Sequence, residues 1–215
     1  MKIEKPRIPS YLEEQTEFHK MVEEEPYLQG PSFKNCLITE PELPCLHLDG
    51  IVFENVCFED CNFLNIDMID VIFENCEFNN VVFSDGAIHR TIFKTCRAMG
   101  TQFIDCVLHN IQYIECNLHY ANFSGSRYKQ TIYKKCDIGS SSFIQCGFKK
   151  TLFEHCSLVD SEFYNTSLDG MNFATSEIDG IGVTQDLLKG AIVSTDQALQ
   201  LVKLLGLIVD ETELE

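Results

Sequence analysis

Large apolar residues recur at every fifth position along most of the chain. In the stretch IVFENVCFEDCNFLN, Phe53, Phe58 and Phe63 are five residues apart. When the chain is cut into blocks of five from residue 31, thirty-three consecutive blocks have a large apolar third residue, except at Ala98. This spacing fits neither the 3.6-residue period of a helix nor the two-residue period of a strand. The unbroken repeat therefore indicates that the repeat itself is the fold.

The first residue of each block is mostly small or β-branched, as at Cys61, Val71, Thr91 and Ser161. On extended backbone it points the same way as the third residue, two positions later. Charged residues, Asn and Gly fill most of the remaining positions. Each block thus has two inward positions and three outward or corner positions. Extended segments with such frequent corners predict a β-solenoid, whose coils stack through hydrogen bonds.

The chain contains eleven cysteines, and most of them fit this interior. Those at the first position of a block are Cys36, Cys61, Cys76, Cys96, Cys106, Cys116, Cys136, Cys146 and Cys156. A free Cys packs as a small hydrophobe, and the chain has no CxxC pair, so we expect neither disulfides nor a zinc site. Cys45 and Cys57 fall at outward positions and are the predicted reactive thiols. So many free thiols, without a signal sequence or membrane span, predict a cytoplasmic protein.

Tandem blocks with a central Leu or Phe and a small residue two positions earlier resemble the pentapeptide-repeat family. That resemblance implies an all-β fold, a right-handed quadrilateral β-helix with four blocks per coil. Residues twenty apart then stack, as Phe53, Phe73 and Phe93 would. We expect about eight coils over residues 31–190, an N-terminal helical cap in residues 1–30, and a C-terminal helix in residues 191–215.

Both ends of the chain differ from the repeat. Residues 10–24, SYLEEQTEFHKMVEE, contain a capping-box pattern from Ser10 to Glu13 and predict a short helix over the first coil. Asp196 is the predicted N-cap of DQALQLVKLLGLIVD, which predicts a helix over 196–209 with apolar residues on more than one face. This surplus predicts a two-fold homodimer, with a plain end cap as the alternative. The predicted dimer residues are Leu199, Leu201, Val202, Leu204, Leu205, Leu207 and Ile208.

The residues predict neither an enzyme nor a cofactor site. A solenoid filled by its own side chains offers no pocket for convergent catalytic groups, and no phosphate-binding or nucleophile motif occurs in the sequence. His89 and His109 would stack on the outside, but Lys129 and Lys149 follow them in the same column, so no third metal ligand is available. We therefore interpret the chain as a binding protein without a metal.

The net charge of −17 is spread unevenly along the chain. Residues 39–85 hold eleven acids and no Lys or Arg, whereas residues 90–150 hold nine bases and three acids. The overall sign disfavours direct nucleic-acid binding. The acidic stretch spans about 11 Å of solenoid, over which DNA carries about six or seven charges, so it is dense enough to imitate DNA. An acidic exterior that serves only solubility is the alternative.

A second acidic stretch, residues 151–190, holds seven acids and one base. The predicted partner-binding acids come from these two acidic stretches, because the basic middle would interrupt an ideal mimic. They are Glu54, Glu59, Asp60, Asp70, Glu74, Glu154, Asp160, Glu162 and Asp169.

The segment GAIVSTDQALQLVKLLGLIVD is similar to the ending of the Qnr and MfpA group within the pentapeptide-repeat family. The resemblance implies a dimeric rod of DNA width that occupies the DNA-binding saddle of DNA gyrase or topoisomerase IV, with inhibition or quinolone protection as the outcome. Unlike several Qnr proteins, this chain has no inserted loop between residues 31 and 195, which favours inhibition. A generic interaction scaffold without DNA mimicry is the second hypothesis.

Overall fold

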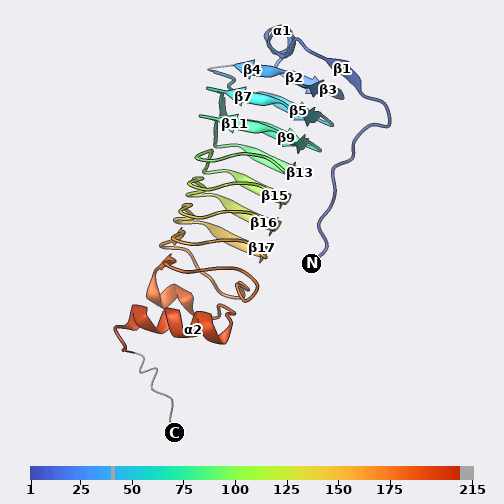
Figure 1. The fold of residues 1–215 in the computed structure, drawn as a ribbon. Helices are drawn as coiled ribbons and strands as arrows, with labels where there is room; N and C mark the ends of the chain where they lie inside the picture. The colour runs from blue at the N-terminus through green and yellow to red at the C-terminus, as the bar shows by residue number, and fades with distance from the viewer. Residues whose placement is uncertain (40–41, 209–215) are drawn as a thin grey trace.

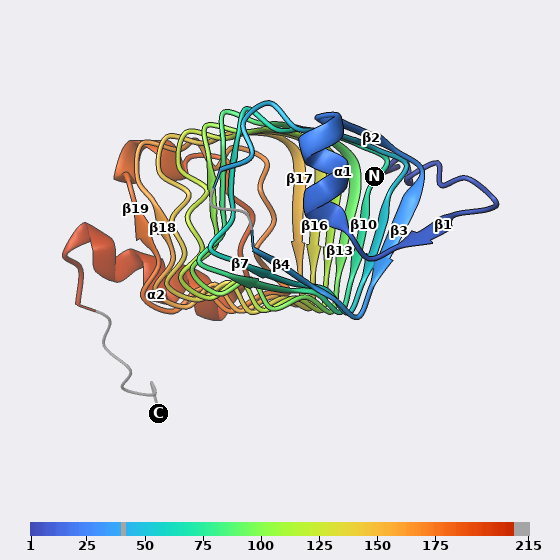
Figure 2. The same cartoon turned by 90° about the horizontal axis from the view of Figure 1, so that it is seen from above.

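The computed structural model describes residues 1–39 and 42–208. The backbone winds into a four-sided β-helix, in which each five-residue block forms one side of a coil (Figures 1 and 2). Residues twenty apart pair in parallel register, as Phe53 does with Phe73. About eight coils stack in this way, which confirms the predicted quadrilateral β-helix with short helices at its two ends.

The strands are short because a corner follows each block. They are β1 (Glu13–Gln15), β2 (Tyr27–Gln29), β3 (Pro31–Lys34), β4 (Leu37–Thr39), β5 (His47–Asp49), β6 (Val52–Glu54), β7 (Cys57–Glu59), β8 (Asn62–Leu64), β9 (Asp67–Ile69), β10 (Ile72–Glu74), β11 (Glu77–Asn79), β12 (Val82–Ser84), β13 (Ala87–Lys94), β14 (Gln102–Ile104), β15 (Val107–Ile114), β16 (Arg127–Lys134), β17 (Gly147–Glu154), β18 (Glu162–Phe163) and β19 (Gly182–Val183). The helices are α1 (Phe18–Glu24), η1 (Gln185–Leu188), α2 (Thr195–Val202) and η2 (Lys203–Leu205).

We number the four sides by the block centres they carry. At twenty-residue intervals, side 1 runs from Phe33 to Phe173, side 2 from Ile38 to Ile178, side 3 from Leu43 to Val183 and side 4 from Leu28 to Leu188. Sides 4 and 1 share one 11-stranded sheet, because β13, β15, β16 and β17 continue around the corner between them. Sides 2 and 3 form separate three-stranded sheets.

Stacked aromatic rings fill the interior. On side 1 the Phe53 and Phe73 rings lie 5.0 Å apart and 6° from parallel. Rings on different sides meet edge to face, as Phe103 and Tyr113 do at 6.1 Å and 80°. Both arrangements are favourable for aromatic pairs and add to the hydrophobic gain from burying the rings. The block centres are buried, Phe103 completely, as the five-residue spacing predicts, apart from the half-buried Phe148, Val183, Leu188 and Val193.

The first residues of the blocks satisfy main-chain carbonyl groups as well as filling space. The Cys76 thiol donates to the Phe53 carbonyl at 3.4 Å, and the Ser126 hydroxyl donates to the Phe103 carbonyl at 2.7 Å. All eleven cysteines are free. Cys45 is exposed, as predicted for a reactive thiol, but Cys57 is half-buried. Burial and the nearby carboxylates raise the pKa of Cys57, so it is a poorer nucleophile than its outward position predicts.

Most blocks turn the corner at the fifth residue, in the left-handed conformation. Asn55 has φ 55°, and Gly50 has φ 65°. Gly, Asn and Asp adopt this conformation at the lowest cost, and they recur at the fifth position. Corner side chains also join successive coils: the Asn55 amide donates to Asn35 at 2.9 Å, and the Asn75 amide donates to Asn55 at 2.6 Å.

The N-terminal end departs from the prediction in three ways. Residues 13–15 form strand β1 on top of β3, so the helix predicted over 10–24 covers only Phe18–Glu24 and lacks a side-chain cap. Helix α1 lies over the open end of the first coil (Figure 2), and its Phe18 ring meets Phe33 at 5.2 Å. The coils also begin one block earlier than predicted, because β2 pairs with β5 and Leu28 is buried.

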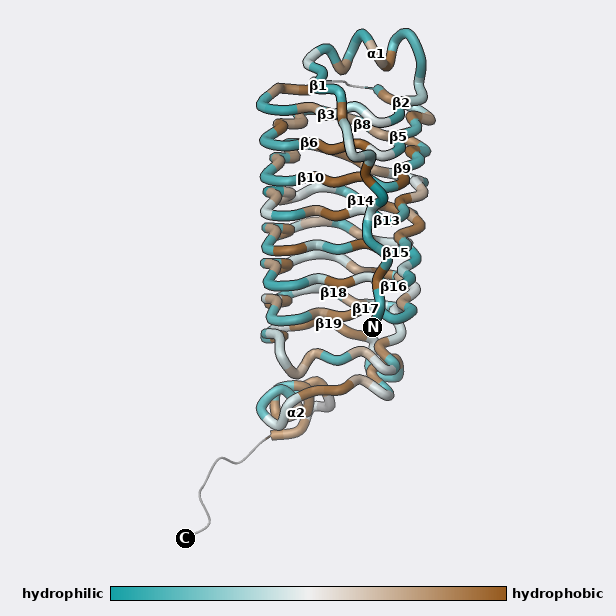
Figure 3. Tube along the Cα trace, turned by 90° about the vertical axis from the view of Figure 1, so that its right-hand side faces the viewer, coloured by the Kyte–Doolittle hydropathy of each residue, from teal (hydrophilic) through white to brown (hydrophobic). Residues whose placement is uncertain are grey.

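Residues 1–9, here the N-terminal strap, run along the corner between sides 4 and 1 (Figures 1 and 3). The Arg7 main-chain N–H donates to Asp70 at 3.0 Å, and the Glu4 N–H donates to Asn110 at 3.2 Å. Gln130 in turn donates to the Lys2 carbonyl at 2.8 Å. The sequence pattern did not predict this strap, because extended segments without a repeat show no periodicity.

At the other end, α2 covers the last coil. Ser194, rather than the predicted Asp196, is its N-cap and forms a capping box with Gln197. The buried Gln197 amide donates to the carbonyls of Phe173 and Ser176, at 2.9 and 2.6 Å. These bonds satisfy carbonyl groups at the open end of the coil. Helical structure ends before Gly206, and Val209 of the predicted 196–209 helix lies outside the described residues.

Candidate functional site

Acidic side chains gather on two adjacent sides of the coil. Between residues 42 and 185, sides 2 and 3 hold eleven acids and one base, Arg97. The acids are Glu42, Glu59, Asp60, Glu77, Asp85, Asp105, Asp137, Asp160, Glu162, Glu177 and Asp179. We call these two sides the acidic surface. Arg97 pairs with Glu77 at 3.0 Å, with most of its side chain in solvent.

Sides 4 and 1 are balanced instead. Over the same residues they carry eight acids and eight bases. Of the nine bases in the basic middle of the chain, residues 90–150, only Arg97 therefore lies on the acidic surface, and the same stretch adds two acids to it, Asp105 and Asp137. The interruption expected from the linear sequence does not occur on sides 2 and 3, because each coil distributes twenty consecutive residues over four directions.

The sequence-predicted acids separate into groups in the structure. Glu59, Asp60, Asp160 and Glu162 are exposed on the acidic surface. The remaining five lie elsewhere.

On side 1, Glu54 pairs with Lys34 at 3.1 Å and Glu74 with Lys94 at 2.6 Å. Glu154 lies opposite Lys134 in the strand register, and Asp169 is exposed on side 4. These four acids do not join the acidic surface.

Asp70 is a structural residue rather than an exposed acid. The residue is 6 % exposed, and its carboxylate accepts two hydrogen bonds from Arg90, at 2.6 and 2.7 Å, and one from the Arg7 main chain. Burial alone raises the pKa of a carboxyl, but these bonds and the two arginine charges lower the pKa of Asp70 overall. Asp70 is therefore unavailable to a partner.

Sequence reasoning missed the other seven acids of the acidic surface. They are Glu42, Glu77, Asp85, Asp105, Asp137, Glu177 and Asp179. Counting charges in columns of twenty residues, instead of along the chain, would have found them.

The part of the chain that the structure describes, residues 1–39 and 42–208, holds no cluster of metal-ligating side chains. In this part of the chain no three His, Cys, Asp or Glu side chains come together as a metal site would require. The His89 and His109 rings stack at 4.6 Å, as predicted. Burial, and then the Arg90 and His109 charges, lower the pKa of His89. No helix in the described part is both long and apolar enough to cross a membrane.

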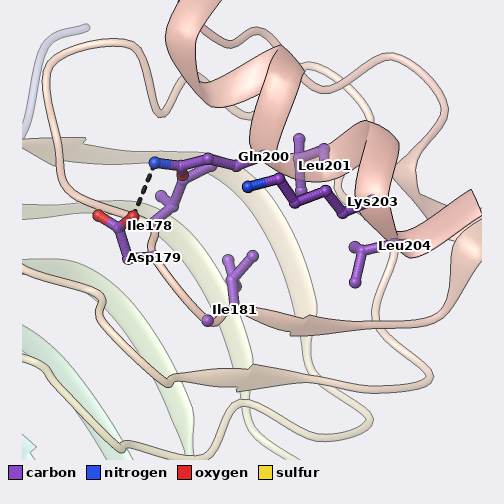
Figure 4. Close-up of a pocket in the computed structure, with 8 residues that line it drawn as sticks. Ile178, Asp179, Ile181, Gln200, Leu201, Lys203 and Leu204 are labelled. Atoms are coloured by element: carbon purple, nitrogen blue, oxygen red, sulfur yellow. Dashed lines mark hydrogen bonds between the residues drawn. The ribbon is translucent and has the colours of Figure 1, made fainter. Parts of the chain in front are cut away.

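The C-terminal end exposes apolar side chains. Ile192, Leu199, Leu204, Leu207 and Ile208 are exposed, the last almost completely. A groove of about 310 Å³ separates α2 from the last coil, and Figure 4 shows Ile178, Ile181 and Leu204 along it. The Gln200 amide spans the groove to Asp179 at 2.7 Å.

Of the predicted dimer residues, Leu199, Leu204, Leu207 and Ile208 are exposed. Leu201 and Val202 are half-buried, and Leu201 packs against the core of its own chain. Of Leu205 only the main chain is described. Dimerisation stays a prediction.

Comparisons with known proteins agree with the repeat. Residues 66–139 match the family model of the pentapeptide repeat region. A structure of trypsin-treated QnrB1, a plasmid-mediated fluoroquinolone resistance protein, is 21 % identical, with a TM-score of 0.49, and the match covers 85 % of this chain and 92 % of that one.

HetL, a pentapeptide repeat protein involved in heterocyst differentiation regulation in the cyanobacterium Nostoc sp. strain PCC 7120, is 11 % identical, with a TM-score of 0.46, over 81 % of this chain and 92 % of HetL. No curated protein matches the chain significantly. Residues 66–139 are thus similar to the pentapeptide repeat region, and the same five-residue frame and coil geometry continue on both sides of that match.

Proposed function

We propose that this protein is a DNA-mimicking binding protein that interacts with DNA gyrase or topoisomerase IV through its acidic surface. The charge distribution around the coil supports this most strongly. From Glu42 to Asp179 the acidic surface spans almost seven coils, about 33 Å at the strand spacing. B-DNA of that length carries about 20 charges, of which roughly half face a partner bound to one side. The eleven acids and one base of the acidic surface are close to that density.

The exposed apolar end supports a homodimer joined through the C-terminal segments. Leu199 of α2, Leu204 of η2 and Leu207, three residues further along the chain, are all exposed, and such apolar side chains at one end of a protein favour burial in an interface. Two stacks of about eight coils joined end to end form a rod about 75 Å long. The dimer would then carry two copies of the acidic surface along one rod, as a partner that binds a long DNA duplex requires.

The choice of gyrase rests on the C-terminal sequence resemblance, and the choice of inhibition rests on the unbroken coils. Between residues 42 and 193 the five-residue frame has no insertion. Within these residues no loop projects from the coils to reach beyond the DNA-binding surface of the partner. We therefore propose competition with DNA as the mechanism.

A supercoiling assay with purified gyrase, with and without ciprofloxacin, tests the proposal. We would reverse the charge of Glu59, Asp60, Asp160 and Glu162 by substitution with Lys. The matched control reverses Glu54, Glu74, Glu154 and Asp169, which lie off the acidic surface. Circular dichroism checks that both variants fold.

The first variant should lose inhibition of supercoiling, and the control should retain most of it. Equal inhibition by the first variant and the unmodified protein contradicts binding through the acidic surface. If the folded, unmodified protein leaves both topoisomerases unaffected at low salt, the DNA-mimic proposal is wrong.

The second candidate function is a protein-interaction scaffold without DNA mimicry. The like-charged neighbours Lys129 and Lys149 on side 4 favour it, because a DNA mimic does not need them. Salt distinguishes the two functions: binding through the acidic surface should weaken steeply as ionic strength rises, whereas binding through shape should change little.

A further inference from the structure

Side 4 carries a basic cluster that the acidic surface does not explain. Lys129 of β16 lies directly opposite Lys149 of β17. Arg127 is on the same strand as Lys129, and Lys150 is at the corner beside Lys149. All four side chains are exposed. We call these four residues the basic cluster.

The cluster breaks the charge pattern found elsewhere on the same sheet. On side 1, bases pair with acids of the neighbouring coil, as in Lys34–Glu54 at 3.1 Å, Lys94–Glu74 at 2.6 Å and Lys135–Glu115 at 3.2 Å. The two like charges that face each other there, Glu54 and Glu74, each have such a basic partner. None of the four cluster residues forms an ion pair within residues 1–39 and 42–208. Like charges directly opposite each other destabilise a sheet, so the cluster opposes stability in a chain rich in acids.

The N-terminal strap brings further positive charge to the same corner. Gln130, the neighbour of Lys129, donates to the Lys2 carbonyl at 2.8 Å and so fixes the end of the strap beside the cluster. The strap and Gln130 line a groove of about 590 Å³. Its charged lining residues are Lys2, Glu4, Lys5 and Arg7, three bases and one acid.

Acids limit the length of this surface. Asp49 and Asp67 lie on side 4 in earlier coils, and Asp169 lies one coil beyond Lys149. The basic cluster and the strap end together span about three coils, or about 15 Å. A DNA duplex laid along the side would continue over the acids and be repelled, whereas about five extended residues of a peptide fit between them.

We infer that the basic cluster, with the end of the N-terminal strap, binds a short acidic polypeptide segment of a protein partner. The Lys and Arg side chains donate charge-assisted hydrogen bonds to its Asp and Glu carboxylates. The inference does not depend on gyrase, because the basic cluster and the acidic surface lie on different sides of the coil.

Fluorescence anisotropy with a labelled hexaglutamate peptide at low ionic strength tests this inference. The test variant replaces Lys129 and Lys149 with Gln. The matched control replaces Lys34 and Lys94 with Gln, which removes the same charge from strand positions on side 1. Hexalysine and a short DNA duplex serve as alternative probes.

We expect the unmodified protein and the control to bind hexaglutamate, and the test variant to bind roughly fivefold or more weakly, as expected when exposed ion pairs are lost. Equal weakening in the test variant and the control would indicate general charge attraction and overturn the inference. No binding of hexaglutamate, or tighter binding of the duplex, would also overturn it.

Discussion

Asp70 and Arg90 occupy the same corner of successive coils and form a two-pronged ion pair. Arg90 Nε lies 2.6 Å from Asp70 Oδ1, and its Nη2 lies 2.7 Å from Oδ2. Both residues have left-handed backbones, with φ 58° and 47°. The Arg7 main chain binds the same carboxylate, so one acid joins two coils and the N-terminal strap.

Replacing Asp70 with Asn should lower the free energy of unfolding by about 3 kcal/mol, because it leaves the largely buried Arg90 charge without its partner. Urea denaturation measures the change. The control, Glu74→Gln, breaks the more exposed pair with Lys94 and should cost less than about 1 kcal/mol. Hydrogen exchange of residues 4–8 should also quicken in the Asp70 variant alone. Similar losses in both variants would contradict a structural role for Asp70.

The same pair should make stability depend on acid pH. Its hydrogen bonds hold the pKa of Asp70 below its ordinary value of 3.8, so the unfolded chain binds the proton more strongly than the folded protein. The stabilisation is complete above about pH 5 and is lost as pH falls through the folded-state pKa. Denaturation between about pH 5 and pH 3 should show a smaller loss for Asp70→Asn than for the unmodified protein. Parallel pH profiles would exclude this linkage.

The repeat could be predicted because each coil depends only on local spacing. Phe53 and Phe73 must stack once four blocks close a coil, whatever the rest of the chain does. The ends could not be predicted in the same way. Residues 13–15 resemble a helix start in sequence, but the open edge of β3 offers main-chain hydrogen bonds, and the segment forms a strand there.

The candidate site was predicted only in part, because charge was counted along the chain. Glu59 and Asp160 were found, but Asp105 and Asp137 were missed because they lie within the basic stretch of the sequence. Asp70 was misassigned for a related reason. Its partner Arg90 is twenty residues away, and the strap that helps to bury it has no periodic signal.

Substitutions of Asn55 test the cost of the left-handed backbone at the corner of the coil. Replacing it with Ala should cost about 1–2 kcal/mol, because Ala strains at φ 55°. The substitution also removes the side-chain hydrogen bonds with Asn35 and Asn75, which adds to the loss of stability. Asn55→Gly removes the same side-chain bonds but tolerates the backbone, so it should be the more stable variant. Thermal unfolding compares the two. Equal stability of the Ala and Gly variants would mean that the left-handed corner costs nothing.

Substitutions of the exposed apolar residues at the C-terminal end test whether the protein forms a dimer. Leu204 and Leu207 are exposed, so replacing both with Asp should leave the coil intact and convert the proposed dimer into a monomer in analytical ultracentrifugation. Leu201 provides the contrast, because it packs against the core of its own chain. Leu201→Ala should therefore mainly lower the melting temperature of the C-terminal end and have less effect on the mass of the assembly. If the unmodified protein is itself a monomer in analytical ultracentrifugation, the dimer proposal is wrong. The acidic rod would then be too short for the proposed competition with DNA.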